Sequence, residues 1–222
     1  PLRSAPEPPT GLKSPHLLLV DKPERTQTQI LIGCLGTHTR DEDHTALTVA
    51  NTVFGGTVTA RLTQEVRAKR GWSYGAYSSL PVDRARQAFS MWTFPQASDA
   101  GACVELELQL LRDWVENGIT EDELSWAKKY LVRSHVFSTD TAAKRLSLAQ
   151  DEVMLELEPG YHERFPERVQ AVTLKEANEA IKRRIDLEHL LIVVLGTAKD
   201  IESDLKRAAG DTFSSSTVAF DT

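Results

Sequence analysis

One arginine and one tyrosine in the first third of the chain could together bind a peptide carbonyl. Arg67 and Tyr74 lie within residues 54–77, which read FGGTVTARLTQEVRAKRGWSYGAY. Arginine offers five N–H donors in a fixed fork, and tyrosine offers one O–H donor. If these donors converge, they can hold a peptide carbonyl or the oxyanion that forms when the carbonyl is attacked. The alternative is a solvated arginine at a helix end and a tyrosine packed in a strand, and spacing alone favours it.

A helix and a strand are expected to bring the two side chains together. The double glycine Gly55-Gly56 precedes a short amphipathic helix, which Gly71 ends. The apolar stripe of this helix is expected to consist of Val58, Leu62 and Val66. A strand is expected over residues 72–80, with Tyr74 on the same face as Trp72 and Ala76. The two elements meet at Gly71, which would place the Arg67 guanidinium close to the Tyr74 phenol.

The segment resembles the arginine–tyrosine signature of the M16 family of zinc metallopeptidases, the pitrilysin-like and mitochondrial processing peptidase-like enzymes. In that signature a Gly-Gly pair, a helix with R-L-x-Q-E-[VI]-R and the run R-G-x-x-Y precede a strand. The matching residues are Gly55, Gly56, Arg61, Leu62, Gln64, Glu65, Val66, Arg67, Arg70, Gly71 and Tyr74. The resemblance implies that Arg67 and Tyr74 contact the substrate or the reaction intermediate from a domain without zinc. It places Gly55 and Gly56 with them in the substrate-binding set.

The histidines of this chain do not predict a metal site. Zinc peptidases of the M16 family carry H-x-x-E-H, in which two histidines one helical turn apart bind zinc and the glutamate activates water. The sequence has six histidines and no such motif. The stretch 38–44, HTRDEDH, comes nearest, but its acids are expected in the first turn of a helix, where they favour the helix dipole. We expect no metal in this chain, and the resemblance implies zinc on a partner domain.

The composition limits the classes of protein to which the chain can belong. Its 222 residues are 41% hydrophobic and 26% charged, which is typical of a soluble globular protein. The formal net charge of −6 argues against a nucleic-acid partner. Its apolar runs are too short to span a membrane. Cys34 and Cys103 are expected to be buried. The compartment stays open between cytoplasm and periplasm.

We expect a single domain after a short linker. Residues 1–15, which begin PLRSAPEPP, have the composition of a linker or edge segment, and residues 16–222 are expected to form one inactive domain of the M16 type. Strands are expected at 16–20, 27–35, 72–80, 88–94, 190–195 and, at an edge, 217–220. Helices are expected at 41–54, 98–116, 120–137, 141–157, 161–171, 174–185 and 200–209. The strand 27–35 is expected to be buried on both faces, and Pro166 to break the helix 161–171. The fold class is α+β, a mostly antiparallel sheet layered with helices.

The leading hypothesis is a non-catalytic domain, or part of a partner subunit, of an M16-like zinc peptidase. The resemblance implies a clamshell in which this domain closes on a zinc-bearing domain around an unfolded peptide. One alternative is a structural or assembly domain of the same fold, in which Arg67 and Tyr74 pair with each other or with neighbours. A second is a peptide-binding module that adds a strand at an open sheet edge. Whether the chain forms a homo-oligomer is left open.

Overall fold

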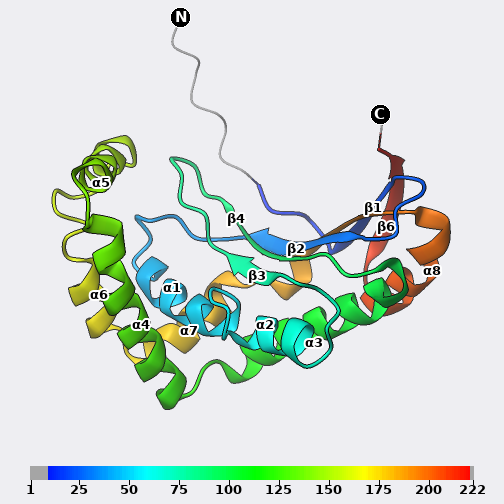
Figure 1. Ribbon diagram of the computed structural model, residues 1–222, viewed down its shortest axis with the longest axis horizontal. Helices are drawn as coiled ribbons and strands as arrows, with labels where there is room; N and C mark the ends of the chain where they lie inside the picture. Colours follow the sequence, from blue (N-terminus) through cyan, green and yellow to red (C-terminus); the bar gives the residue numbers. More distant parts are fainter. Residues whose placement is uncertain (1–9, 221–222) are drawn as a thin grey trace, which may run out of the picture.

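The computed structural model describes residues 10–220, within which six strands form one sheet (Figure 1). They are β1 (His16–Asp21), β2 (Gln29–Leu35), β3 (Ala76–Ser79), β4 (Ala88–Thr93), β5 (Leu191–Gly196) and β6 (Ser214–Ala219). Their order across the sheet is β3-β4-β2-β5-β1-β6. The pairs β3–β4, β4–β2 and β2–β5 are antiparallel, whereas β1 is parallel to both β5 and β6. The expected α+β class and mostly antiparallel sheet are therefore confirmed.

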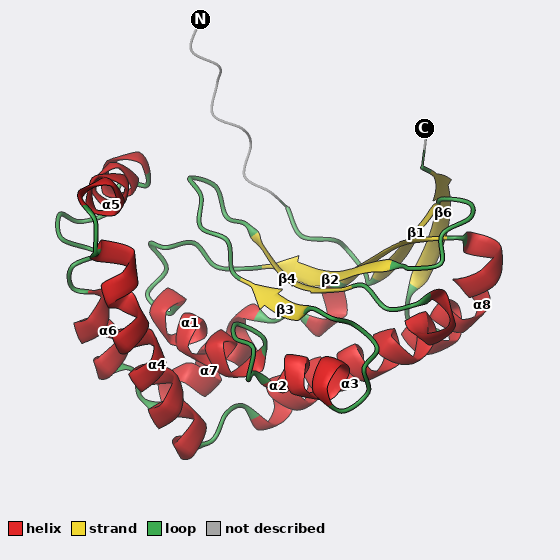
Figure 2. Ribbon diagram, viewed as in Figure 1, coloured by secondary structure: helices red, strands yellow, loops and turns green. Residues whose placement is uncertain are grey.

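Helices cover one face of this sheet. The α-helices of the described part of the chain are α1 (His44–Phe54), α2 (Arg61–Thr63), α3 (Ala100–Asn117), α4 (Glu121–Thr139), α5 (Ala142–Met154), α6 (Phe165–Ala171), α7 (Leu174–Arg184) and α8 (Ala198–Ala209), and not all of them contact the sheet. Figure 2 shows α1, α3, α7 and α8 along one face, while the opposite face carries no helix from residues 10–220. In β2, Ile30 and Ile32 are fully buried under the helices and Leu31 is exposed. The prediction that this strand is buried on both faces is therefore wrong.

The core lies between the sheet and the helices, and aromatic rings fill its centre. Phe54, at the end of α1, stacks on Trp114 of α3 with ring centroids 4.3 Å apart. Phe89 of β4 packs against the same indole at 5.8 Å. All three side chains are fully buried. Because they come from two helices and a strand, they fix α1 and α3 against the sheet beside the segment that carries Arg67.

Two helices begin where the sequence predicts, whereas α6 begins later than expected. Thr120 and Thr173 form the N-terminal capping boxes of α4 and α7, each with a glutamate three residues later. Pro166 does not break a helix, because α6 begins at Phe165 and the proline lies in its first turn. A proline is tolerated there since its missing N–H would have no partner inside the helix. The expected break is therefore wrong.

The acids before α1 bind arginines instead of occupying its first turn. Arg86 donates to the two carboxylate oxygens of Asp41 at 2.5 and 3.0 Å. Arg184, at the end of α7, donates to those of Asp43 at 2.8 and 2.9 Å. The first turn of α1 holds no acidic residue, so the expected dipole role is wrong. These two ion pairs attach the loop before α1 to elements distant in the sequence.

The two ends of the described chain differ, since the C-terminal end forms a strand and residues 10–15 form neither a helix nor a strand. β6 confirms the expected edge strand, although it begins at Ser214 and pairs along the whole of β1. Residues 10–15 contain no helix or strand, and residues 1–9 of the expected linker lie outside the described residues. A single domain from residue 16 onward stays a prediction. Among residues 10–220, no helix combines the length and the apolar character that crossing a bilayer requires.

Candidate functional site

The helix that carries Arg67, residues 61–68 (the signature helix), changes its hydrogen-bond pattern partway along. Arg61–Thr63 is α-helical, and Gln64–Ala68 forms a π-helical turn. There the Lys69 N–H donates to the Gln64 carbonyl at 3.0 Å. π-Helical turns are rare in proteins, but those that occur are often found at functional sites. Arg67 lies within this turn.

Two apolar side chains of the signature helix are buried, whereas Arg67 is half-buried. Leu62 and Val66 are fully buried, as expected. Val58 precedes the helix and is 62% exposed, so its place in the apolar stripe is wrong. Gly71 ends the helix as expected, since its φ is 66° and its N–H donates to the Arg67 carbonyl at 3.0 Å.

Tyr74 lies in a loop, and the strand expected from residue 72 begins only at Ala76. The residues on either side of it, Ser73 and Gly75, are buried. The Ser73 hydroxyl donates to the Gly75 carbonyl at 2.5 Å and accepts from the Phe94 N–H at 3.0 Å. These bonds fix the loop on both sides of Tyr74, whose side chain is 74% exposed. The expected alternation of residues 72–77 is wrong, because side chains in this loop do not alternate between two faces as they do in a strand.

The Arg67 guanidinium lies over the face of the Tyr74 ring, with Cζ 4.3 Å from the ring centroid. This is a cation–π contact. Within residues 10–220 neither the guanidinium nor the phenol hydroxyl makes a hydrogen bond or ion pair. The two side chains that the sequence placed together do meet at the surface, through the ring face rather than through the hydroxyl.

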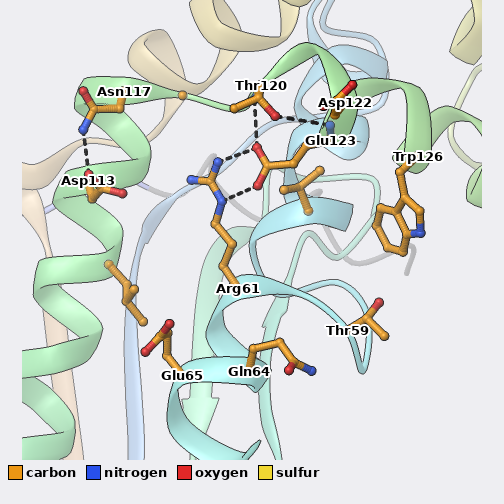
Figure 3. Close-up of a pocket in the computed structure, with 13 residues that line it drawn as sticks. Thr59, Arg61, Gln64, Glu65, Asp113, Asn117, Thr120, Asp122, Glu123 and Trp126 are labelled. Atoms are coloured by element: carbon orange, nitrogen blue, oxygen red, sulfur yellow. Dashed lines mark hydrogen bonds and ion pairs between the residues drawn. The ribbon is translucent and has the colours of Figure 1, made fainter. Parts of the chain in front are cut away.

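The other charged residues of the signature are used inside the domain. Arg61 donates to both carboxylate oxygens of Glu123, from Nε at 2.8 Å and from a terminal nitrogen at 2.5 Å (Figure 3). Glu123 also accepts the Thr120 N–H at 2.8 Å in the capping box of α4. Burial opposes ionisation of Glu123, but the hydrogen bonds from Arg61 and Thr120 outweigh it and hold its pKa below the ordinary value. The sequence predicts a helix from residue 120, but it does not indicate Arg61 as a partner of Glu123.

Glu65 and Arg70 form a second internal group. Glu65 accepts from Lys69 at 2.5 Å and from Arg70 at 2.7 Å, and these bonds lower the pKa of its carboxyl. Arg70 also donates to the Glu65 carbonyl at 2.9 Å. Among the charged signature residues of the described chain, Arg67 is therefore the one without a charged partner.

A pocket of about 740 Å³ lies on the other side of the signature helix, against the end of α3 and the start of α4 (Figure 3). Arg61, Gln64 and Glu65 line it together with Trp126 of α4. Arg67 and Tyr74 do not line this pocket. The candidate pair and the pocket are thus two separate features of one helix.

The double glycine lets α1 end against the edge of the sheet. A Cβ on Gly55 would lie 2.3 Å from Ser78 Oγ and 2.7 Å from the Ser78 nitrogen. The Gly55 carbonyl accepts the Ser78 N–H at 2.9 Å. The N–H groups of Gly55 and Gly56 both donate to the Asn51 carbonyl, at 3.0 and 2.8 Å. Gly55 is buried and Gly56 exposed, and contact of either with a substrate stays a prediction.

The histidine-rich stretch before α1 does not form a metal centre. His44 Nδ1 pairs with the Thr37 hydroxyl at 2.9 Å, and burial lowers the pKa of its imidazole to about 4. Within residues 10–220, no group of three or more His, Cys, Asp or Glu side chains is placed to hold a metal ion. The described residues therefore do not supply the three or four ligands that zinc sites in proteins use.

Comparison with known proteins agrees with the geometry. A family model described as Peptidase M16 inactive domain matches residues 1–131. A Mycobacterium tuberculosis protein named an uncharacterized zinc protease is 31% identical over 188 residues, which are 82% of this chain and 41% of that protein. A Helicobacter pylori protein named a non-peptidase homolog is 25% identical over 147 residues, which are 66% of this chain and 34% of that protein.

A solved structure extends the likeness to three dimensions. The crystal structure of a peptidase M16 inactive domain from Pseudomonas fluorescens matches with a TM-score of 0.78 and 27% identity, over 86% of this chain and 45% of that chain. The present chain spans less than half the length of each of these three relatives. The family model covers more than half of the chain and the fold agrees with it, so the chain belongs to the M16 peptidase family, as its inactive domain.

Proposed function

We propose that this domain contributes Arg67 and Tyr74 to a peptide-hydrolysing site whose zinc is held by a partner domain. The observation that carries the proposal is the surface contact between the two side chains, with the donors of both unused in the described chain. The other signature charges have internal partners. The length of the relatives named zinc protease supports a partner domain in the same protein.

The two side chains would bind the carbonyl of an unfolded peptide. Stacking on the Tyr74 ring restricts the Arg67 guanidinium, so less side-chain freedom is lost when a ligand binds. As the carbonyl oxygen gains negative charge, hydrogen bonds from the guanidinium and the hydroxyl to that oxygen strengthen. Zinc on the partner domain would supply an activated water. The task of this chain is to bind and orient the peptide and to stabilise the oxyanion.

The test uses the complete protein that carries this domain, with Tyr74→Phe and Arg67→Ala. Tyr74→Phe removes the hydroxyl and keeps the ring on which Arg67 stacks. Each change is expected to lower kcat for peptide hydrolysis by about 10²–10³-fold, as for the loss of one oxyanion donor. Tyr77→Phe and Lys69→Ala are the matched controls and should leave kcat unchanged. Folded Tyr74→Phe and Arg67→Ala proteins with wild-type turnover would exclude the proposed role.

A second function, a structural or assembly domain without catalysis, is favoured by a different observation. Arg67 and Tyr74 contact each other, which is the pairing a purely structural role would require. One relative is also named a non-peptidase homolog. The two functions differ in one sequence feature, since a peptidase needs H-x-x-E-H elsewhere in the complete protein. They also differ in one assay, because a chelator abolishes hydrolysis only where zinc takes part.

A further inference from the structure

The face of the sheet opposite the helices is apolar along its centre. Strand pairing places Trp92 of β4, Leu31 of β2, Val193 of β5 and Leu18 of β1 in one row across this face (the open-face row). Leu31 and Trp92 are each 40% exposed, and the other two are half-buried. Figure 2 shows no helix from residues 10–220 on this side. A sheet face that meets water usually carries polar side chains, so the row indicates a surface that is covered in the complete molecule.

The apolar surface extends to both sides of the open-face row. Leu195 of β5 and Val20 of β1 lie opposite each other on one side. Leu191 and Leu35 lie on the other side. All four are half-buried and belong to the same face, because they alternate with the fully covered residues of their strands. A continuous apolar area of this kind, unlike a single exposed leucine, is typical of an interaction site.

The dimensions of this area match one helix. The open-face row crosses three strand spacings of about 4.8 Å, so it is about 14 Å wide. It ends in residues with hydroxyl groups, Tyr77 on β3 and Ser216 on β6. Along the strands, the seven residues of β2 span roughly 20 Å. A helix with its side chains is about 10–12 Å wide, and about 13 of its residues span 20 Å. A second sheet would need apolar residues on the outer strands as well.

Part of this face is hollow. A cavity of about 630 Å³ lies over β2 and its neighbours, where Gly33 and Ala88 have no large side chain. Thr10, Gly11 and Leu12, the first described residues, line the same cavity. Leu12 is still 39% exposed. The segment that leads into β1 therefore runs along this face but leaves room for a large apolar side chain.

Another part of the same protein is the occupant that these observations favour. The chain spans less than half the length of its relatives, 41% of the Mycobacterium tuberculosis protein and 45% of the Pseudomonas fluorescens chain. Because residues 10–12 lie on the open face, chain that precedes them enters the domain there. A segment tethered in this way has a high effective concentration, so a contact the size of one helix suffices. A second copy would have to form the same small contact from dilute solution.

We propose that the open-face row is the docking surface for one amphipathic helix of about 13 residues from the remaining part of the complete protein. The inference rests on the proposed function only in its premise that such a part exists, and the roles of Arg67 and Tyr74 do not enter it. The docked helix presents apolar residues three and four positions apart to the sheet. One large side chain enters the hollow beside Gly33.

Oxidative footprinting of the complete wild-type protein tests whether the face is covered. Trp92 and Trp126 are the same residue type with the same 40% exposure in this chain, so hydroxyl radicals oxidise them equally unless something covers one of them. We expect Trp92 to be oxidised severalfold more slowly than Trp126 at every protein concentration. Equal rates would overturn the proposal. Protection of Trp92 that is lost on dilution would identify a second copy, and protection that needs an added peptide would identify substrate; either result would also overturn it.

Photo-cross-linking identifies the occupant. With p-benzoylphenylalanine in place of Leu31, the complete protein should form a cross-link within one copy, to a peptide outside residues 1–222. That peptide should have apolar residues at helical spacing. The same group in place of Trp126 is the matched control and should not join this peptide. A dimeric product, a cross-link to residues 1–15 or a joined peptide without helical spacing would overturn the proposal. Neither measurement uses turnover, so an unchanged kcat in Arg67→Ala would refute the proposed function and leave this inference standing.

Discussion

Arg61 and Glu123 join two helices through a two-point ion pair, with N···O distances of 2.8 and 2.5 Å. Arg61 opens the signature helix, and Glu123 lies in the first turn of α4. The same carboxylate closes the capping box with Thr120. One side chain therefore both starts α4 and holds the helix that carries Arg67. The position of Arg67 and Tyr74 therefore depends on the Arg61–Glu123 ion pair, which neither of them makes.

Arg61→Ala is expected to lower the free energy of unfolding by about 1–2 kcal/mol, because a charged two-point hydrogen bond is lost at a half-buried site. Arg61→Lys should recover only part of this, since an ammonium cannot match both carboxylate oxygens as the guanidinium fork does. Urea unfolding measures the effect. Arg207→Ala, which breaks an exposed ion pair with Asp204 on α8, is the control and should cost less than about 0.5 kcal/mol. Equal losses for Arg61→Ala and Arg207→Ala would contradict the argument.

Gly55→Ala should destabilise the domain by roughly 1–3 kcal/mol, the usual cost of overpacking. The new methyl group would lie 2.7 Å from the Ser78 backbone nitrogen, so α1 and β3 must move apart. Thermal unfolding gives the size of the effect. Gly11→Ala is the matched control, since a Cβ there would have no atom within 4 Å. An unchanged melting temperature for Gly55→Ala would mean that the edge of the sheet adapts without strain.

Features that neighbouring residues determine could be predicted from the sequence, and features that depend on distant contacts could not. The helices that begin near residues 120 and 174, the end of the signature helix at Gly71 and the strand at 88–94 all depend on neighbouring residues, and all were predicted. The partner of Arg61 could not be predicted, because it lies 62 residues away and depends on how two helices pack.

Two errors near the site have the same kind of cause. The prediction that Tyr74 lies in a strand, on the same face as Trp72 and Ala76, was wrong. Ser73 hydrogen-bonds to Gly75 and to the distant Phe94, and these bonds hold the segment as a loop outside the sheet. The apolar content of β2 led to the prediction that both of its faces are buried, but helices of the described chain cover only one of them. In both cases tertiary contacts determine which side chains are buried, and a local alternation of apolar and polar residues does not reveal those contacts. The meeting of Arg67 and Tyr74 was accessible from the sequence because a short helix–Gly–loop segment contains both.

Glu107 should make the domain less stable as the pH rises. Its side chain on α3 is fully buried, and neither carboxyl oxygen has a hydrogen-bond partner among residues 10–220. Burial raises its pKa to about 8 from an ordinary value of 4.5, with the nearby Thr93 hydroxyl opposing. The folded state therefore keeps a proton that the unfolded chain releases. Its stabilising effect is complete below pH 4.5 and is lost as the pH rises to about 8, at roughly 1.4 kcal/mol per pH unit.

Glu107→Gln isolates this contribution, because the amide has nearly the same shape and does not titrate. Urea unfolding between pH 6.5 and 8 is the appropriate window. His44 has the opposite sign, since its pKa of about 4 makes the folded state lose stability as the pH falls from 6.5 toward 4. That effect fades within about one pH unit above 6.5, so the upper part of the window reports on Glu107. The wild-type protein should lose stability across the window and Glu107→Gln should lose much less; parallel curves would show that Glu107 is ionised in the fold.

Ser73→Ala should loosen the loop that presents Tyr74 without touching the phenol. The variant loses the bonds to the Gly75 carbonyl and from the Phe94 N–H, which leaves the N–H of the half-buried Phe94 without this partner, at a cost of about 1 kcal/mol. Hydrogen exchange followed at residues 73–75 should accelerate. Ser78→Ala is the matched control, because it removes an equally buried hydroxyl, bound to Asn51 Oδ1 at 2.6 Å, from the neighbouring strand.

The two serine variants should be comparably destabilised, yet only Ser73→Ala should speed exchange around Tyr74. Where the complete protein hydrolyses peptides, Ser73→Ala should also lower kcat more than Ser78→Ala does, since the oxyanion donor is no longer fixed before the substrate arrives. Ser73→Thr, which retains a hydroxyl, should restore slow exchange if the extra methyl group fits. Equal exchange in Ser73→Ala and Ser78→Ala would mean that Tyr74 is held by its contact with Arg67 alone.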